Sequence, residues 1–545
     1  MRPLNASRPA PLPWPADVDP AHAHQAISRL RDNVSSRVDA DGLIRDECRS
    51  RVLESALALT LMTRTGTASP ARDRVLAYLQ ARLDSPQEFD RVLATLAVAT
   101  ADVWAPARDT DLIEKLTDAV LGSAPEFISA RRRKMLYAVL SVLGCPLPAD
   151  VAPAPDEVAP NDPTHSWNVV QQAAVTLILA SATKVDNPAT DAALATLTAT
   201  NPGTTVWEGY VLMHLLTLHA LAGVPGQEAT VRSGIRTVLQ HQREDGGFPF
   251  IAEMHHWCTA PAAIGLAATG APSQLLRTMA DALVRHQGGA PLPSLSRGVP
   301  LTGGWSMSPG VALNDVDCTA TALEFVHETD PVAYRGAVRR GVDALLALQG
   351  DDGGFPTYVA GARSEPCMTA AAVNALAPHA DTLAARERAL AYLAESQLAD
   401  GGYEPGWSRS RLHAMFRARL AVGTASADDR RIAEVAQRME RSVCATQNSD
   451  GGWGMQPGDP SDAISTAYGL ITLCCGNEAR AIGRALSWLV ENQNTDGGYS
   501  GPPDMVGPRP FPYHVPVLTD APVLLAFGHV RSRFLGAAPL SQGVA

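Results

Sequence analysis

Apolar residues recur at three- and four-residue spacing along most of the chain. The pattern is clearest in seven segments, 48–62, 126–143, 167–182, 207–221, 319–326, 384–395 and 463–474. This spacing places apolar side chains on one face of an α-helix, whereas the alternation typical of strands is sparse. The sequence therefore predicts an all-α protein.

Five copies of one phrase, Gln-x-x-Asp-Gly-Gly-aromatic, each follow an apolar helical run. They occupy Gln242–Phe248, Gln349–Phe355, Gln397–Tyr403, Gln447–Trp453 and Gln493–Tyr499. From Gln349 on, consecutive copies begin 48, 50 and 46 residues apart. Such a period indicates a copied helix–turn–helix unit whose neighbours share one core. The paired glycines permit a sharp turn at positive φ, and the aromatic can pack back on the preceding helix.

The repeat is interrupted once. A degenerate copy begins at His286–Gln287 and is completed by Gly303–Trp305, and the excess length brackets residues 306–321. An insertion in a regular repeat is where we expect function. The segment carries Asp315 and Asp317 at the start of an apolar helix. Because an Asp at a helix start is commonly a cap, this pattern alone leaves capping and catalysis both open.

Composition narrows the class of protein. The 545 residues are 46% hydrophobic and carry a formal net charge of -11, which argues against nucleic acid as a general partner. No apolar run reaches the ~18–20 residues of a spanning helix, and the Pro-rich start lacks a signal-peptide core. Eight cysteines without framework spacing indicate reduced thiols. We expect a cytoplasmic protein without an integral membrane segment, either a monomer or a homodimer.

The sequence Asp315-x-Asp317-x-Thr319-Ala320, beside the glycine-rich repeats, resembles the Asp-x-Asp-Asp-Thr-Ala motif of class II terpene cyclases. The likeness to bacterial members covers most of residues 200–530. It implies two α/α-barrel domains, β and γ, of the terpene cyclase/prenyltransferase-repeat type. The ranges expected on this basis are a disordered tail at 1–19, a β domain at 20–66 and 290–545, and an inserted γ domain at 67–289.

The resemblance also assigns the initiating acid. In the family the middle Asp, here Asp317, protonates the terminal alkene of a folded polyprenyl diphosphate, rings close in sequence, and the diphosphate is retained. Burial and the neighbouring Asp315 both raise a carboxyl pKa, which keeps such an acid protonated. Asn314 and Thr319 flank the pair. Cys318 stands where the family has Asp, and a thiol is a poor partner for a carboxyl, so this departure leaves the orientation and reprotonation of Asp317 open.

Further residues are assigned through the same resemblance. Aromatic faces stabilise carbocations, and the candidates are Trp257, Trp305, Trp407, Phe416 and Tyr468. Candidates for binding the diphosphate are Arg131, Arg132, Arg133, Lys134, Arg363, Arg417 and Arg509. Candidate final bases are His255, His256 and Tyr513. Each aromatic could instead be a packing residue, and the basic run a solvated helix face. Mg²⁺ commonly accompanies such diphosphates, although the spacing identifies no ligand for it.

The predicted enzyme is an isomerase or intramolecular lyase of terpenoid biosynthesis. It would cyclise geranylgeranyl diphosphate to a bicyclic labdane-, halimane- or clerodane-type diterpenyl diphosphate. The alternative substrate is farnesyl diphosphate, which would give drimenyl diphosphate. A squalene-type cyclase would carry an apolar membrane-inserting helix, which the sequence lacks. A class I reaction would need Asp-Asp-x-x-Asp, which neither Asp351–Asp352 nor Asp428–Asp429 provides.

Two further classes stay open at this point. A protein prenyltransferase-like subunit would need a zinc site with Asp-x-Cys spacing, whereas Asp317 and Cys318 are adjacent. A non-catalytic helical-repeat scaffold would bind partner peptides and have no deep apolar cavity.

Overall fold

The computed structural model describes residues 12–15, 18–67, 69–101, 111–122, 126–148, 151, 163–184, 188–289, 295–426 and 428–534. Within these ranges the protein is largely α-helical, which confirms the predicted fold class. The strands described are short. In one antiparallel pair, β1 (Ser50–Arg51) lies beside β2 (Phe248–Pro249), and in the other β3 (Val299–Pro300) lies beside β4 (Val359–Ala360).

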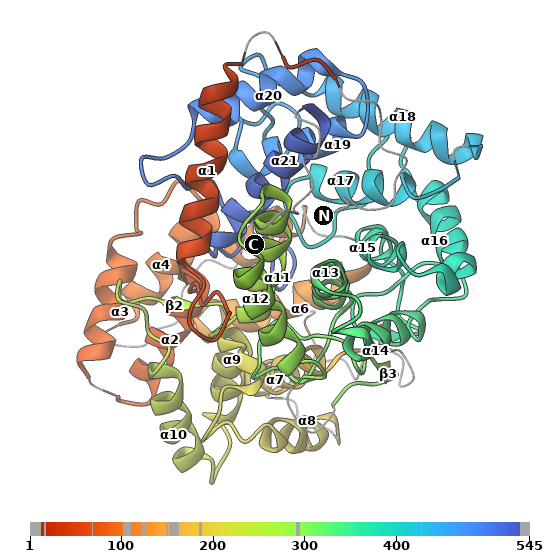
Figure 1. Ribbon diagram of the computed structural model, residues 1–545. Helices are drawn as coiled ribbons and strands as arrows, with labels where there is room; N and C mark the ends of the chain where they lie inside the picture. The colour runs from red at the N-terminus through yellow and green to blue at the C-terminus, as the bar shows by residue number, and fades with distance from the viewer. Residues whose placement is uncertain are drawn as a thin grey trace.

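Six described helices surround the axis of a closed barrel, which we call the larger barrel (Figure 1). They are α11 (His255–Thr269), α13 (Val316–Thr329), α15 (Pro366–Leu376), α17 (Leu412–Val422), α19 (Ala463–Cys474) and α21 (Val517–Phe534). Each packs on the next, and α21 packs back on α11. These helices are apolar around most of their circumference, and every residue of α19 is buried. Such helices are stable only when other helices cover them on all sides.

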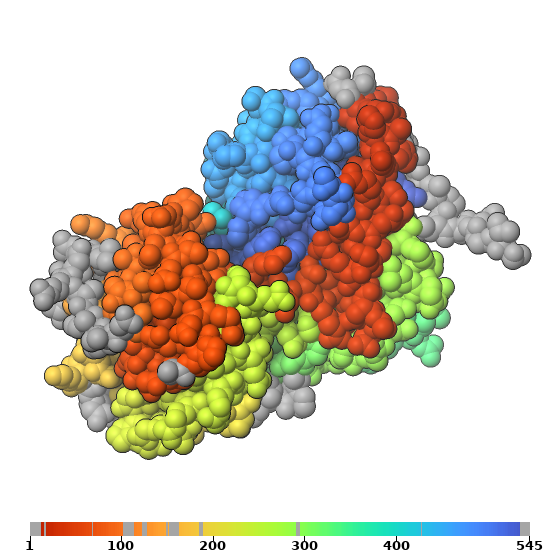
Figure 2. All heavy atoms as spheres, turned by 90° about the vertical axis from the view of Figure 1, so that its left-hand side faces the viewer, coloured from red at the N-terminus to blue at the C-terminus, as the bar shows by residue number. Residues whose placement is uncertain are grey.

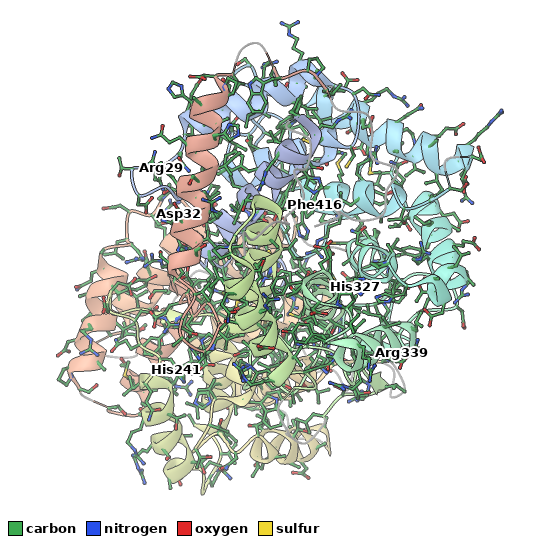
Figure 3. All side chains as sticks on the ribbon, viewed as in Figure 1. Arg29, Asp32, His241, His327, Arg339 and Phe416 are labelled. Atoms are coloured by element: carbon green, nitrogen blue, oxygen red, sulfur yellow. The ribbon has the colours of Figure 1, made fainter. Side chains whose placement is uncertain are left out.

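An outer layer covers this ring. Its helices are α1 (Pro20–Ser36), α12 (Ser273–Arg285), α14 (Arg335–Leu346), α16 (Leu383–Glu395), α18 (Arg430–Ala445) and α20 (Ala479–Glu491), with a short 3₁₀ turn η2 (Ala380–Thr382) before α16. These helices are amphipathic, and α18 for example buries Ile432, Val435, Met439 and Val443 along one face. Figure 3 shows Phe416 inside the ring, whereas Arg339 on α14 points outward.

The glycine-rich phrase holds successive helices together. Gln447 Nε2 donates to the Gly451 carbonyl at 2.8 Å and to the Ala481 carbonyl of α20 at 2.9 Å. Gly451 has φ +98°, and a Cβ there would lie 2.7 Å from a backbone oxygen. The Trp453 indole donates to the Val443 carbonyl at 2.9 Å, which confirms that the aromatic packs back on the preceding helix.

The same pair of glutamine bonds closes the larger barrel. Gln493 Nε2 donates to the Gly497 carbonyl at 2.8 Å and to the Ala26 carbonyl of α1 at 2.9 Å. The first described helix therefore takes the place that an outer helix would have after the last repeat. This contact explains why helices from both ends of the chain share one barrel.

The second lobe is an inserted helical unit, seen beside the larger barrel in Figure 2. Its elements are α2 (Val52–Arg64), α3 (Pro70–Gln80), α4 (Glu88–Ala99), α5 (Asp111–Leu121), α6 (Glu126–Val142), α7 (Ser166–Thr183), α8 (Pro188–Ala199), η1 (Trp207–Gly209), α9 (Val211–Leu221) and α10 (Glu228–Leu239). α2 packs on α4 and α9, and α7 packs on α6, α8 and α9. No helix in the described ranges is long and apolar enough to cross a membrane.

The helix contacts correct the predicted domain boundaries. α11 and α12, expected in the γ domain at 67–289, pack in the larger barrel, and α2, expected in the β domain at 20–66, packs in the inserted unit. The glycine-rich phrase that follows α11 and α12 is interrupted before Gly303. The sequence pattern therefore did not indicate that these two helices form one more repeat of the larger barrel. Part of the tail expected to be disordered is also ordered, because the Leu12 amide donates to the Arg533 carbonyl at 3.1 Å. Residues 1–11, 16 and 17 lie outside the described residues.

Candidate active site

The two acids lie at the start of α13, inside the larger barrel. Asp315 is the N-cap, and its Oδ1 accepts a hydrogen bond from the Cys318 amide at 2.7 Å. The exposed fractions of Asp315 and Asp317 are 4% and 7%. Asp317 shares a helix face with Thr321 and Glu324, at i+4 and i+7, which line a cavity inside the barrel. Asp315 thus satisfies the capping interpretation, while Asp317 pairs with Arg417, which lines that cavity; neither acid is itself among the lining residues.

Burial raises the pKa of both carboxyls. It raises the pKa of Asp315 to about 7, although the bond from the Cys318 amide opposes it. Asp315 Oδ2 is buried and has no hydrogen-bond partner among the residues described. Burial also raises the pKa of Asp317, although its ion pair with the Arg417 guanidinium opposes the rise. Burial therefore favours the protonated form of both acids, while Arg417 is placed to pair with an Asp317 carboxylate.

The flanking motif residues support the acids structurally. The Thr319 hydroxyl accepts the Trp305 amide at 2.9 Å, which ties the motif to the preceding repeat. Burial raises the pKa of the Cys318 thiol well above its usual range, so the thiol stays neutral. Asn314 is buried next to Asp315, at 1% exposure. With Cys318 neutral, no third carboxylate of the motif competes with Asp317 for Arg417.

The cavity beside Asp317, which we call the barrel cavity, has a volume of about 100 Å³. Its walls include Trp257, Phe416, Tyr468 and His413. Phe416 and Tyr468 are stacked with centroids 4.7 Å apart, and His413 meets both rings edge to face. Burial and the nearby Arg417 hold the pKa of His413 well below its usual range, so the imidazole is neutral. Electron-rich faces of this kind stabilise a carbocation without reacting with it.

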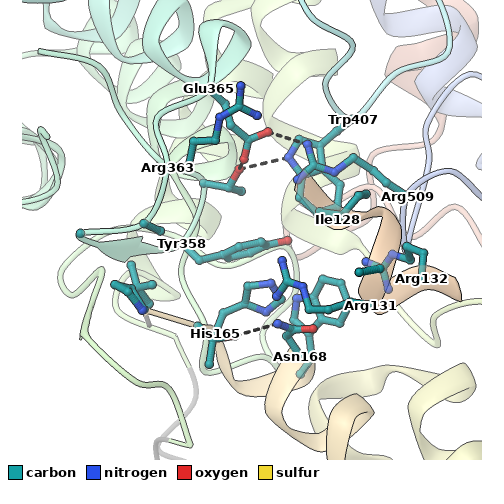
Figure 4. Close-up of a pocket in the computed structure, with 18 residues that line it drawn as sticks. Ile128, Arg131, Arg132, His165, Asn168, Tyr358, Arg363, Glu365, Trp407 and Arg509 are labelled. Atoms are coloured by element: carbon teal, nitrogen blue, oxygen red, sulfur yellow. Dashed lines mark hydrogen bonds and ion pairs between the residues drawn. The ribbon is translucent and has the colours of Figure 1, made fainter. Parts of the chain in front are cut away.

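A second hollow of about 400 Å³, the basic pocket, lies between the inserted unit and the larger barrel (Figure 4). Four of the predicted diphosphate-binding cations line it, namely Arg131, Arg132, Arg363 and Arg509. Arg509 donates from Nη1 to Glu365 Oε2 at 2.6 Å and lies 4.1 Å from the centroid of the Trp407 ring. The structure thus collects cations from both lobes around one space.

The electrostatics of the basic pocket favour an anion. Arg132 is buried, and burial together with Arg131 and Arg509 lowers its pKa to about 9. Burial and the same three arginines hold the pKa of His165 well below its usual range. The buried Arg132 Nε and His165 Nδ1 atoms have no hydrogen-bond partner within the part of the chain that the structure describes. A bound anion would relieve the repulsion and accept these hydrogen bonds.

Other predicted residues lie elsewhere. Arg133 pairs with Asp118 at 2.8 Å, Arg417 pairs with Asp317, and Lys134 is not among the residues lining the basic pocket. Trp305 is fully buried, and its indole donates to the Leu283 carbonyl at 2.7 Å, so it is a packing residue. Trp407 lines the basic pocket rather than the barrel cavity.

The three candidate bases do not line either hollow. His255 lies beside Glu253 at 3.5 Å, and His256 Nδ1 is 2.9 Å from the Ser306 carbonyl. The Tyr513 ring packs on Phe250 at 5.3 Å between centroids. Their catalytic role stays a prediction, and the geometry gives it no support.

Sequence reasoning missed several residues around these hollows. His165, Asn168, Tyr358 and Glu365 line the basic pocket, and His413 lines the barrel cavity. Glu365 could have been found by superposing repeats, since it occupies in α15 the position that Asp315 occupies in α13. The others have no signal in one sequence, because their role depends on which helix faces meet.

The basic pocket does not supply ligands for Mg²⁺. Its one lining carboxylate is Glu365, whose Oε1 accepts from the Thr357 hydroxyl at 2.5 Å and whose Oε2 accepts from Arg509. No group of three or more His, Cys, Asp or Glu side chains able to hold a metal occurs in the described ranges. A Mg²⁺ ion held by the protein needs a carboxylate of its own, so these residues do not fit that role.

Comparison with known proteins finds relatives that match most of the chain. The model of the prenyltransferase alpha-alpha toroid domain matches residues 319–505. A drimenyl diphosphate synthase of Streptomyces showdoensis is 38% identical, over 97% of this chain and 98% of that protein. One from Streptantibioticus cattleyicolor is 37% identical, over 92% and 93%. The solved ent-copalyl diphosphate synthase of Streptomyces platensis shares the fold, with a TM-score of 0.57 and 18% identity over 93% of this chain and 99% of that one.

The double-lobed fold, with an acid pair buried at the head of an inner helix, defines an enzyme that starts cyclisation by protonation. Relatives of this identity and coverage show that the chain belongs to the bacterial class II terpene cyclases. The family and the enzyme class predicted from the sequence are thereby confirmed.

The Asp317–Arg417 ion pair predicts the pH dependence of cyclisation. Arg417→Gln removes the charge that favours the Asp317 carboxylate, so the pKa of Asp317 rises. Only the protonated acid can donate a proton, so the cyclisation rate falls as pH rises through the pKa of that acid. This alkaline limb of the pH–rate profile should move to higher pH in the variant, by about one to two units. The measurement is the cyclisation rate of wild type and variant across pH.

Arg419→Gln is the matched control. Arg419 lies on the same helix but pairs with Glu440 at 2.7 Å. It should leave the limb where it is. An unmoved limb in Arg417→Gln would show that this ion pair does not govern the acid.

Proposed function

We propose that this enzyme cyclises farnesyl diphosphate to drimenyl diphosphate, with Asp317 as the acid and the diphosphate retained. Two relatives named drimenyl diphosphate synthase, at 38% and 37% identity, support this substrate over the geranylgeranyl diphosphate preferred from the sequence.

The observation that carries the proposal is the position of the acid between the two hollows. Arg417, the ion-pair partner of Asp317, lines the barrel cavity, while Thr357, whose carbonyl accepts the amide of the neighbouring Val316 at 2.9 Å, lines the basic pocket. A prenyl diphosphate has two matching ends, an anionic head and an apolar tail. The head would bind in the basic pocket, and the tail would fold into the barrel cavity beside the acid.

The reaction begins with proton transfer from the Asp317 carboxyl to the distal alkene of the chain. A C–H bond forms, the alkene electrons are used, and a tertiary cation results. The next two alkenes attack in turn and close two rings, and loss of one proton from the last cation forms the final double bond. The proton count is unchanged, so the reaction is an isomerisation.

The surrounding residues have separate tasks in this scheme. Arg417 stabilises the Asp317 carboxylate left by the transfer, and the Phe416 and Tyr468 faces stabilise the cation. Arg131, Arg132, Arg363 and Arg509 hold the diphosphate away from the acid, so that it is not ionised. Mg²⁺ could accompany the diphosphate through water and phosphate oxygens, and no step here depends on it. The cytoplasmic location, the absence of a nucleic-acid partner and a monomeric or homodimeric state remain predictions.

Asp317→Asn should abolish cyclisation and leave the fold intact, because the amide is nearly isosteric but cannot donate an acidic proton. Wild type and variant are incubated with farnesyl and, separately, geranylgeranyl diphosphate, treated with phosphatase and analysed by mass spectrometry. Wild type should give a drimane alcohol from the C15 substrate. Full activity of Asp317→Asn would show that another group is the acid, and a C20 product alone would overturn the substrate.

Arg132→Gln should raise KM for the diphosphate substrate about tenfold or more, with a smaller change in kcat. The reason is that a charged hydrogen bond to phosphate contributes roughly 1.5–3 kcal/mol. Arg133→Gln is the matched control, since Arg133 is the adjacent residue but pairs with Asp118. Equal effects of the two variants on KM would place the diphosphate outside the basic pocket.

A further inference from the structure

Glu365 occupies a repeated position at the head of an inner helix. The amides of Asp315, Glu365 and Asp462 donate to the carbonyls of the aromatics in their repeats, at 3.2, 2.9 and 2.9 Å. Asp315 and Asp462 then cap their own helices, with bonds of 2.7 and 2.8 Å from backbone amides. Glu365 makes no such cap. The Glu365 side chain therefore does not cap its helix, whereas the side chains of Asp315 and Asp462 do.

The Glu365 carboxylate instead lies in the wall of the basic pocket, beside Arg509 (Figure 4). One oxygen accepts from the Thr357 hydroxyl at 2.5 Å and the other from Arg509 at 2.6 Å. The Thr357 carbonyl accepts the amide of Val316, the residue between the two acids, at 2.9 Å. Three hydrogen bonds, through Glu365 and Thr357, thus link Arg509 to the backbone that carries Asp317.

The ionisable groups around Asp317 come from its own segment and from α15, α17 and α19. Asp315, Cys318 and Glu324 lie on its own segment, Glu365 and Cys367 at the start of α15, Arg417 and His413 on α17, and Tyr468 on α19. The thiols, the phenol and the imidazole are neutral, since burial shifts the pKa of each away from its charged form. Burial raises the pKa of Asp315 and of Glu324 to about 7, while the charge of Glu365 adds to burial in raising the pKa of Asp317 against the effect of Arg417. The influence of Glu365 depends on how far Arg509 neutralises it.

We propose that Glu365 is a positioning residue that couples diphosphate binding to proton loading of Asp317. A diphosphate that takes the Arg509 guanidinium leaves the Glu365 carboxylate uncompensated beside Asp317, so the acid takes up a proton when substrate arrives. This inference rests on the proposed function, since it needs a diphosphate in the basic pocket. Linkage makes the coupling reciprocal, so a proton on Asp317 strengthens diphosphate binding.

Glu365→Gln removes the coupling charge while keeping the size of the side chain. The alkaline limb of kcat should move to lower pH by about one unit, because the substrate-bound acid loses its negative neighbour. KM should not rise, because Arg509 loses a competitor for the diphosphate. Asp462→Asn is the control, since it changes the same repeat position away from both hollows, and it should keep the wild-type profile. An unchanged limb in Glu365→Gln would overturn the coupling.

Proton uptake on binding tests the same inference without turnover. Inorganic diphosphate is titrated calorimetrically into wild type and Asp317→Asn, in buffers of different ionisation enthalpy. Wild type should take up more protons on binding than Asp317→Asn, and Glu365→Gln should reduce that difference. Equal uptake, with binding still weakened by Arg132→Gln, would overturn the coupling and leave the proposed function standing. Binding indifferent to Arg132→Gln would overturn both.

Discussion

The exclusion of water from two carboxyls beside one guanidinium determines what this protein can do. An alkene is a very weak base, so it accepts a proton only from an acid that is protonated and poorly solvated. Burial favours both conditions at Asp317 because it raises the pKa of that carboxyl, while the Arg417 ion pair opposes the rise. The same pair stabilises the carboxylate after transfer. Burial alone would raise the pKa of the carboxyl so far that it becomes a weak proton donor. The ion pair alone would lower that pKa and leave the acid ionised.

The helical repeat makes this burial possible. Each glutamine of the glycine-rich phrase bonds its own turn and the next outer helix, which fixes the heads of the inner helices around one axis. Three of those heads carry an acid at the same position. Asp462 caps its helix, Asp315 caps its helix two residues before Asp317, and Glu365 binds Arg509 instead. One structural position thus has three uses, because side-chain length and neighbours differ from repeat to repeat.

Much of this arrangement was predictable from the sequence. The repeat predicted the helical architecture, and the interrupted copy pointed to Asp315 and Asp317, because both signals are local in the chain.

The sequence did not predict which direction each side chain takes from its helix or loop, and therefore which hollow it lines. Of four consecutive cations, Arg131 and Arg132 line the basic pocket while Arg133 turns to Asp118, since neighbours on a helix differ by about 100° in direction. Trp305 and Trp407 have similar contexts in the chain, yet one is in the packed core and the other faces the pocket. The domain boundary was missed for a related reason, because packing across the ring assigns α11 to its barrel.

The central claim is that a carboxyl hydrogen, exchangeable with solvent, is delivered to carbon while the diphosphate stays attached. Incubation of the enzyme with farnesyl diphosphate in D₂O, followed by mass spectrometry of the intact product, tests it directly. The account predicts a cyclic diphosphate that carries one deuterium from the initiating step. A product without deuterium, or one that has lost its diphosphate before phosphatase treatment, would contradict it.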